Sequence, residues 1–88
     1  LAETPHIERE LMMVKIKVNE HTSTNIRSIV DIFRGRILDV TQNSYVVEVT
    51  GASEKLDAFI AALSSDSIIE VVRSGATGIS RGERGLHL

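Results

Sequence analysis

The sequence of 88 residues contains no cysteine. A disulfide framework, a zinc site built on thiolates and a cysteine nucleophile are therefore excluded. The same absence excludes soft-metal chaperones, which bind their metal through paired cysteines. What remains is a chain that a single hydrophobic core must hold together, because this length gives room for one domain.

Long hydrophobic runs and excess charge of one sign are also missing. No apolar run approaches the ~20 residues of a membrane-spanning helix, and residues 1–10 lack the basic and apolar regions of a secretion signal. The net charge of −2 offers no general attraction to phosphate backbones. We therefore expect a cytoplasmic protein with neither a membrane nor a nucleic acid as its partner.

Two periodicities run through the remaining sequence and predict alternating strands and helices. An alternation with period two predicts strands over residues 9–18, 36–42, 44–50 and 68–73. Apolar residues at positions i, i+3, i+4 and i+7 predict two amphipathic helices. Their stripes are Ile26, Ile29, Val30 and Phe33 in the first, and Leu56, Phe59, Ile60 and Leu63 in the second.

The expected helix ends have recognisable signals. The polar cluster over residues 22–25 and the hydroxyl of Ser53 are predicted to cap the two helix starts, and Gly35 is predicted to end the first helix in a left-handed conformation. The second stripe repeats the first after 30 residues, so the two halves resemble one repeated strand-helix-strand unit.

The element order β-α-β-β-α-β, with right-handed crossovers, predicts a sheet with strand order 4-1-3-2. The sequence therefore predicts an α+β fold. We expect a ferredoxin-like (ACT-like) βαββαβ sandwich, with a four-stranded antiparallel sheet and two helices on one face. Residues 1–8 are expected to form an N-terminal extension, residues 9–74 the domain, and residues 75–88 a flexible C-terminal tail.

Alternation along the strands predicts which side chains lie under the helices. Truncating a buried member of this layer, such as Ile16, to alanine should cost about 2–5 kcal/mol. The expected layer comprises Met12, Val14, Ile16, Val18, Leu38, Val40, Tyr45, Val47, Val49, Ile69 and Val71.

The opposite face of the sheet is expected to be half apolar. Lys15 and Lys17 should form cross-strand ion pairs with Glu48 and Glu70. A contiguous apolar patch with charged surroundings is typical of an interface, so we expect self-association or docking on this face. The candidate interface residues are Leu11, Met13, Ile37, Val46, Ile68 and Val72.

Catalytic and ligand-binding signals are weak throughout. Histidines 6, 21 and 87 share no metal-ligand spacing and are expected to be exposed, and no serine lies in a nucleophile elbow. The glycine- and arginine-rich C-terminal segment lacks the strand-glycine-helix context of a phosphate-binding loop. RNA-recognition domains share the element order but stack bases on sheet aromatics, whereas Phe33 and Phe59 lie on the predicted helices. We expect no catalytic, cofactor-binding or metal-binding residue in this chain.

Several collinear segments resemble the C-terminal domain of the acetolactate synthase (acetohydroxyacid synthase) regulatory small subunit. ERELMMVKIKV resembles the opening of that domain, and IVDIFRGRILDVTQNSYVVEVTG resembles its helix, turn and hairpin. SEKLDAFIAAL, IIEVVRSG and ISRG resemble the second helix, final strand and arginine-glycine tail. The resemblance covers about residues 5–82. Its motifs contain Arg9, Glu10, Arg34, Gly35, Arg73, Gly75, Arg81 and Gly82, whose individual roles it does not assign.

This resemblance implies a non-catalytic regulatory chain. Small subunits of that family bind the catalytic large subunit, raise its activity and confer feedback inhibition by branched-chain amino acids such as valine. Thiamine diphosphate, FAD and magnesium are held by the catalytic partner. The family's effector-binding residues lie in an N-terminal ACT domain and carry over to no position of this sequence. A homodimer or higher homo-oligomer is expected.

Two other functions share this fold class. An amino-acid-binding effector or oligomerisation domain of a transcriptional regulator is the main alternative, because ACT-like folds accept small amino acids between protomers. An enzyme of the acylphosphatase kind would need an anion-binding loop with a fixed arginine after the first strand. The sequence there is Asn19-Glu20-His21-Thr22, which contains no arginine.

Overall fold

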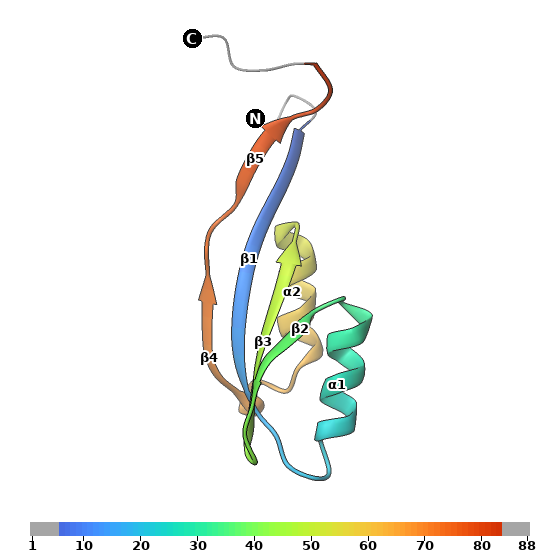
Figure 1. Ribbon diagram of the computed structural model, residues 1–88, viewed down its shortest axis with the longest axis vertical. Helices are drawn as coiled ribbons and strands as arrows, with labels where there is room; N and C mark the ends of the chain where they lie inside the picture. Colours follow the sequence, from blue (N-terminus) through green and yellow to red (C-terminus); the bar gives the residue numbers. More distant parts are fainter. Residues whose placement is uncertain (1–5, 84–88) are drawn as a thin grey trace.

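The computed structural model describes residues 6–83 and has the predicted strand and helix order, with one further strand at the end (Figure 1). A short 3-10 helix, Ser65–Ser67, lies between the second helix and the strand that follows it. The strands and helices are β1 (His6–Lys17), α1 (Ser23–Ile32), β2 (Arg36–Val40), β3 (Ser44–Gly51), α2 (Ser53–Ala62), β4 (Ile68–Arg73) and β5 (Thr77–Ser80).

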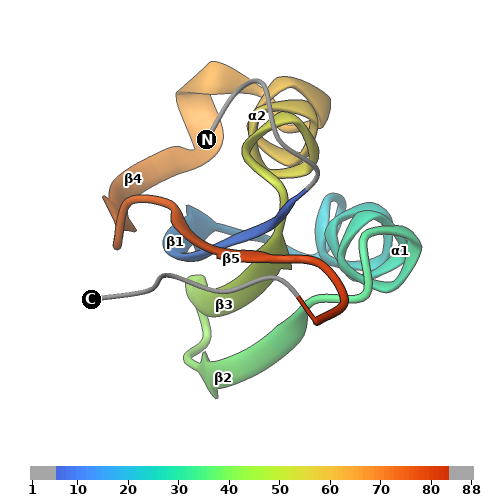
Figure 2. The same ribbon diagram turned by 90° about the horizontal axis from the view of Figure 1, so that it is seen from above.

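The main sheet has the order β2-β3-β1-β4, and all its neighbours are antiparallel. This is the predicted order read from the other edge. Both helices lie on one side of the sheet (Figure 2), so the opposite side is left without a covering layer. The predicted ferredoxin-like, ACT-like α+β sandwich is confirmed.

The core lies between β1, β3 and the two helices. Alternate residues of β1 and β3 are buried, and the predicted helix stripes are buried or partly buried against them. The rings of Phe33 and Phe59 meet edge to face, with their centroids 5.4 Å apart, and this contact joins α1 to α2. The buried apolar residues are Met12, Val14, Ile16, Val18, Ile26, Val30, Tyr45, Val47, Val49, Leu56, Phe59 and Leu63.

Four members of the predicted helix-facing layer are not buried. Leu38 and Val40 on β2 and Ile69 and Val71 on β4 remain exposed. These strands are the two edges of the main sheet, and the buried cluster takes its sheet residues from the central strands β1 and β3. The prediction of burial was therefore correct for β1 and β3 and wrong for the edge strands.

The two ends of the chain contain more structure than the sequence predicted. β1 begins at His6, inside the expected N-terminal extension, and its first four residues pair with β5. Thr77–Ser80 is therefore a strand, not part of a flexible tail. The resulting two-stranded ribbon extends beyond the main sheet (Figure 1), and residues 84–88 of the expected tail lie outside the described residues.

α1 ends in a Schellman motif whose left-handed residue is Arg34, not Gly35 as predicted. Arg34 has φ of 57°, and its N–H donates to Asp31 O while the N–H of Gly35 donates to Val30 O. Gly35 lies close to β3 instead. A Cβ atom there would lie 3.1 Å from both Glu48 O and Val49 Cγ2, so a larger residue would require these neighbours to shift.

The helix starts also differ from the prediction. The side chain of Thr22, at the N-cap of α1, makes no capping hydrogen bond, and Asn19 Oδ1 instead accepts from the N–H groups of His21 and Thr22. Ala52 occupies the N-cap of α2, and the hydroxyl of Ser53 donates to Glu10. Ser53 therefore links the helix to β1 and does not cap it.

Candidate interaction face

The uncovered side of the main sheet carries four of the six predicted interface residues. Leu11 and Met13 alternate with the buried residues of β1, and Met13 lies opposite Val72 of β4. Val46 lies opposite Lys15, on the same side. We call this set, Leu11, Met13, Val46 and Val72, the open-face cluster.

The prediction that Ile37 and Ile68 lie on this side of the sheet was wrong. Ile37 lies opposite Val47, whose side chain is buried under the helices, and Ile68 lies opposite Ile16 and packs against the core. Both pairings have a register irregularity next to these residues. A bulge inserts one residue into a strand and so reverses which residues face which side.

The open-face cluster borders paired charges. Lys15 Nζ lies 3.2 Å from Glu70 Oε1, as predicted, whereas Glu48 lies 3.9 Å from Arg36. A hollow of about 240 Å³ lies between Met13, Val46 and Val72, with Lys15 and Glu70 at its side. Apolar side chains around a hollow with an ion pair at the rim can pack against a complementary protein surface.

A second feature, which the sequence reasoning missed, joins β1 to the end of β4. Glu10 is only 7% exposed, and the guanidinium of Arg73 donates to both of its carboxylate oxygens, at 3.0 and 2.7 Å. The carboxylate also accepts from Ser53 Oγ and from the N–H of Gly75. Arg73 donates in addition to Asp57 of α2, at 2.7 Å.

This network holds both ionised groups in place. The hydrogen bonds from Arg73 and its positive charge lower the pKa of Glu10 below its ordinary value, despite partial desolvation. Hydrogen bonds from Gly75 and Ser53 act in the same direction. Glu10 and Asp57 raise the pKa of Arg73. Glu10 is the first residue of β1 opposite β3 and directly follows the part paired with β5, so the network anchors the junction between the main sheet and the ribbon.

The structure shows where several residues of the family motifs lie. Glu10, Arg73 and Gly75 meet in one network, while Arg34 and Gly35 form the end of α1. The sequence signal was present in the ERE and RSG motifs. No local spacing could pair them, because Glu10 and Arg73 are 63 positions apart.

The histidines and possible metal sites can be placed only in part. His21 is exposed, as expected, but the side chain of His6 is only 15% exposed and its Nε2 lies 2.8 Å from Glu8 Oε2. His87 lies outside the described residues.

Two further kinds of site are absent from the part of the chain that the structure describes. Within residues 6–83, no three histidine, aspartate or glutamate side chains gather in a way that could hold a metal ion. No helix in this range is long and apolar enough to span a membrane.

Comparison with known proteins identifies the family. A family model described as the small subunit of acetolactate synthase matches residues 9–82. This chain belongs to that family. The predicted resemblance is therefore confirmed over nearly the whole domain.

Relatives and a solved structure of acetolactate synthase small subunits agree with this assignment. The isozyme 3 small subunit of Salmonella typhimurium is 45% identical over 85 residues, which cover 96% of this chain and 52% of the relative. The small subunit of Haemophilus influenzae is 42% identical over 87 residues, covering 98% and 53%. The crystal structure of the Thermotoga maritima small subunit superimposes with a TM-score of 0.86 at 32% identity, covering 91% of this chain and 49% of that one.

The chain therefore spans about half the length of the acetolactate synthase small subunits that it matches. These relatives are all named as small subunits, and nothing in them favours the transcriptional-regulator alternative.

Proposed function

We propose that this chain is a non-catalytic regulatory domain of acetolactate synthase, corresponding to the C-terminal part of the small subunit. It would support association with the catalytic large subunit, activation of that subunit and feedback regulation of the synthesis of valine, leucine and isoleucine. The observation that carries the proposal is the match of residues 9–82 to the small-subunit family.

The chemistry of the proposed holoenzyme belongs to the partner. In this proposal the large subunit is a thiamine-diphosphate-dependent transferase, and this chain contributes no cofactor and no catalytic side chain. Its effect is a coupling free energy between subunits, typically about 1–3 kcal/mol, which a change of contacts at an interface can supply. We place the holoenzyme in the cytoplasm.

The proposed contact surface is the open-face cluster. The cluster is apolar, lies on the side of the sheet that neither helix covers, and borders the Lys15–Glu70 ion pair. This composition suits an interface with an apolar centre and a polar rim. We propose that the domain associates through this surface, as a homodimer or higher homo-oligomer.

The experiment mixes this chain with the catalytic large subunit of the same organism and measures both co-elution in size-exclusion chromatography and the rate of acetolactate formation. We expect co-elution and a raised rate. If the two chains elute separately and the rate does not change at any ratio, the proposed function is wrong.

Two matched variants test the surface separately from the function. Met13→Glu places a charge in the open-face cluster, whereas Ile32→Glu places one at a position on α1 that is already 74% exposed. We expect Met13→Glu to lower the mass of the homo-oligomer in multi-angle light scattering and Ile32→Glu to leave it unchanged. If both variants keep the mass of the unmodified chain, the open face is not the contact, although the function stands.

A further inference from the structure

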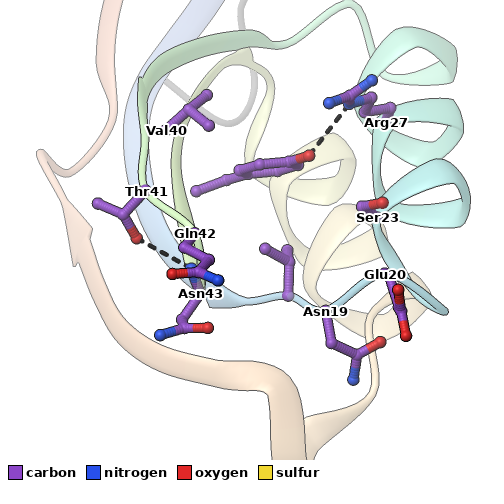
Figure 3. Close-up of a pocket in the computed structure, with 10 residues that line it drawn as sticks. Asn19, Glu20, Ser23, Arg27, Val40, Thr41, Gln42 and Asn43 are labelled. Atoms are coloured by element: carbon purple, nitrogen blue, oxygen red, sulfur yellow. Dashed lines mark hydrogen bonds between the residues drawn. The ribbon is translucent and has the colours of Figure 1, made fainter.

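A groove on the helix side of the sheet lies apart from the open-face cluster. Its walls come from the loop between β1 and α1, from α1, and from the turn between β2 and β3 (Figure 3). Its volume is about 510 Å³. Small-molecule sites generally measure roughly 300–1,000 Å³, so the groove is large enough for a compact organic ligand.

Arg27 supplies a positive charge at this groove that a neutral partner orients. Its Nε donates to the hydroxyl of Tyr45 at 3.1 Å, and its guanidinium carbon lies 5.7 Å from the centre of the Tyr45 ring. Tyr45 is only 3% exposed, so the phenol that positions Arg27 is itself held in the core. Since this partner is neutral, the charge of Arg27 is oriented without being paired.

The other arginines near acidic groups differ from Arg27. Arg36 and Arg73 form ion pairs, whereas Arg27 forms none with any residue in the range 6–83. With Nε engaged by Tyr45, the two Nη groups remain as donors. A carboxylate can accept from both at once, an arrangement that favours arginine over lysine in recognising planar oxyanions.

The remaining walls determine which kind of anion fits. Val18 and Val40 provide apolar surface. Ser23, Gln42 and Asn43 bring polar side-chain groups that, within residues 6–83, make no hydrogen bond. Glu20 also lines the groove, with its carboxylate 3.6 Å from His21, and it disfavours a ligand with several negative charges. A phosphate carries about −1.5 to −2 at neutral pH, whereas a carboxylate carries a single charge.

We propose that this groove binds a small organic carboxylate. The carboxylate oxygens accept from the Nη groups of Arg27, and the apolar part of the ligand lies against Val18 and Val40. This inference goes beyond the proposed function, since neither the open-face cluster nor the catalytic large subunit takes part in it.

The test is a titration of the 15N-labelled chain followed by heteronuclear NMR, with hexanoate as the probe. Hexanamide, which keeps the apolar tail and loses the charge, serves as the neutral control, and inorganic phosphate as the alternative anion. We expect saturable shifts with hexanoate, confined to residues 18–27 and 40–45, and no saturation with hexanamide or phosphate.

Two variants that each remove one positive charge separate the site from general electrostatics. Arg27→Gln removes the proposed donor, and Arg81→Gln changes an exposed position that does not line the groove. Loss of a charge-assisted hydrogen bond should weaken hexanoate binding at least about tenfold in Arg27→Gln, while Arg81→Gln should leave it unchanged. Both amide spectra should retain the dispersion of the folded chain.

Three results would overturn the proposal. Equal shifts with hexanoate and hexanamide would show that the charge is not recognised. Unchanged binding by folded Arg27→Gln would show that Arg27 is not the donor. Tighter binding of phosphate at the same residues would show that the ligand class is wrong.

Discussion

Glu10 and Arg73, which are 63 positions apart in the sequence, form a two-point ion pair. The pair lies at the junction of the main sheet and the β1–β5 ribbon. Both carboxylate oxygens are engaged, and two further donors, Ser53 and Gly75, complete the set. A nearly buried carboxylate that is fully hydrogen-bonded is stabilising when charged and leaves its partners unsatisfied when it is removed.

This geometry predicts a pH-dependent stability that Glu10→Gln removes. The native state lowers the pKa of Glu10 below its ordinary value of 4.5. The unfolded chain therefore takes up this proton first as the pH falls, and the stabilisation by Glu10 is present above pH 4.5 and lost as the pH passes through the lowered pKa. Urea denaturation at several pH values between about 7 and 3 measures the effect.

We expect Glu10→Gln to have a lower urea midpoint than the unmodified chain near pH 7, and the two midpoints to converge at the acid end. Glu8→Gln provides the control, because it removes a carboxylate at a neighbouring and less buried position of β1. A constant difference between Glu10→Gln and the unmodified chain over the whole range would contradict the assignment.

The centre of the core predicts the largest effect of a single truncation. Ile16 is fully buried between the helices and the sheet, so Ile16→Ala should lower the free energy of unfolding by about 2–5 kcal/mol. Ile32→Ala, on the exposed side of α1, should change it by less than about 0.5 kcal/mol. Similar urea midpoints for the two variants would show that the core is centred elsewhere.

The register irregularity in β4 predicts different stability effects for two adjacent isoleucines, Ile68 and Ile69. Ile68 packs against the core, whereas Ile69 is 55% exposed. Ile68→Ala should therefore cost about 2 kcal/mol, and Ile69→Ala less than about 1 kcal/mol. Thermal denaturation of both variants measures the difference, and the reverse order of stabilities would favour the uninterrupted alternation predicted from the sequence.

The open-face cluster predicts the oligomeric state. Leu11→Glu combined with Val72→Glu places two charges in the cluster and should yield a folded monomer in multi-angle light scattering. Ile32→Glu combined with Leu38→Glu adds the same charge at exposed positions outside the cluster and should keep the mass of the unmodified chain. An unchanged mass for the first variant would leave an edge strand or the ribbon as the contact.

Sequence periodicity correctly located the central elements and failed where the chain leaves regular geometry. The stripes through Val30 and Phe59 and the alternation through Val14 and Val47 lie where they were predicted. Ile37 and Ile68 were assigned to the wrong side because alternation cannot reveal a bulge. β5 was missed because its four residues lie in a glycine-rich segment and are too few to show an alternation. The segment is a strand because it pairs with β1.

The candidate sites were predictable to different extents. The side of the sheet on which Leu11, Met13, Val46 and Val72 lie was predicted correctly, because the alternation along their strands is regular at these residues. Arg27 and Tyr45 gave no such signal, because each belongs to an ordinary helix or strand and their contact spans 18 positions.

The sequence by itself determined the family, through collinear segments along nearly the whole chain. It also determined the order of the elements and the apolar stripes of the two helices, because these depend on residues a few positions apart. Only the tertiary structure decided the pairing of Glu10 with Arg73, the docking of β5 and the sides on which Ile37 and Ile68 lie. Each of these depends on the register between distant strands, where a shift of one residue exchanges the two faces and brings different side chains together.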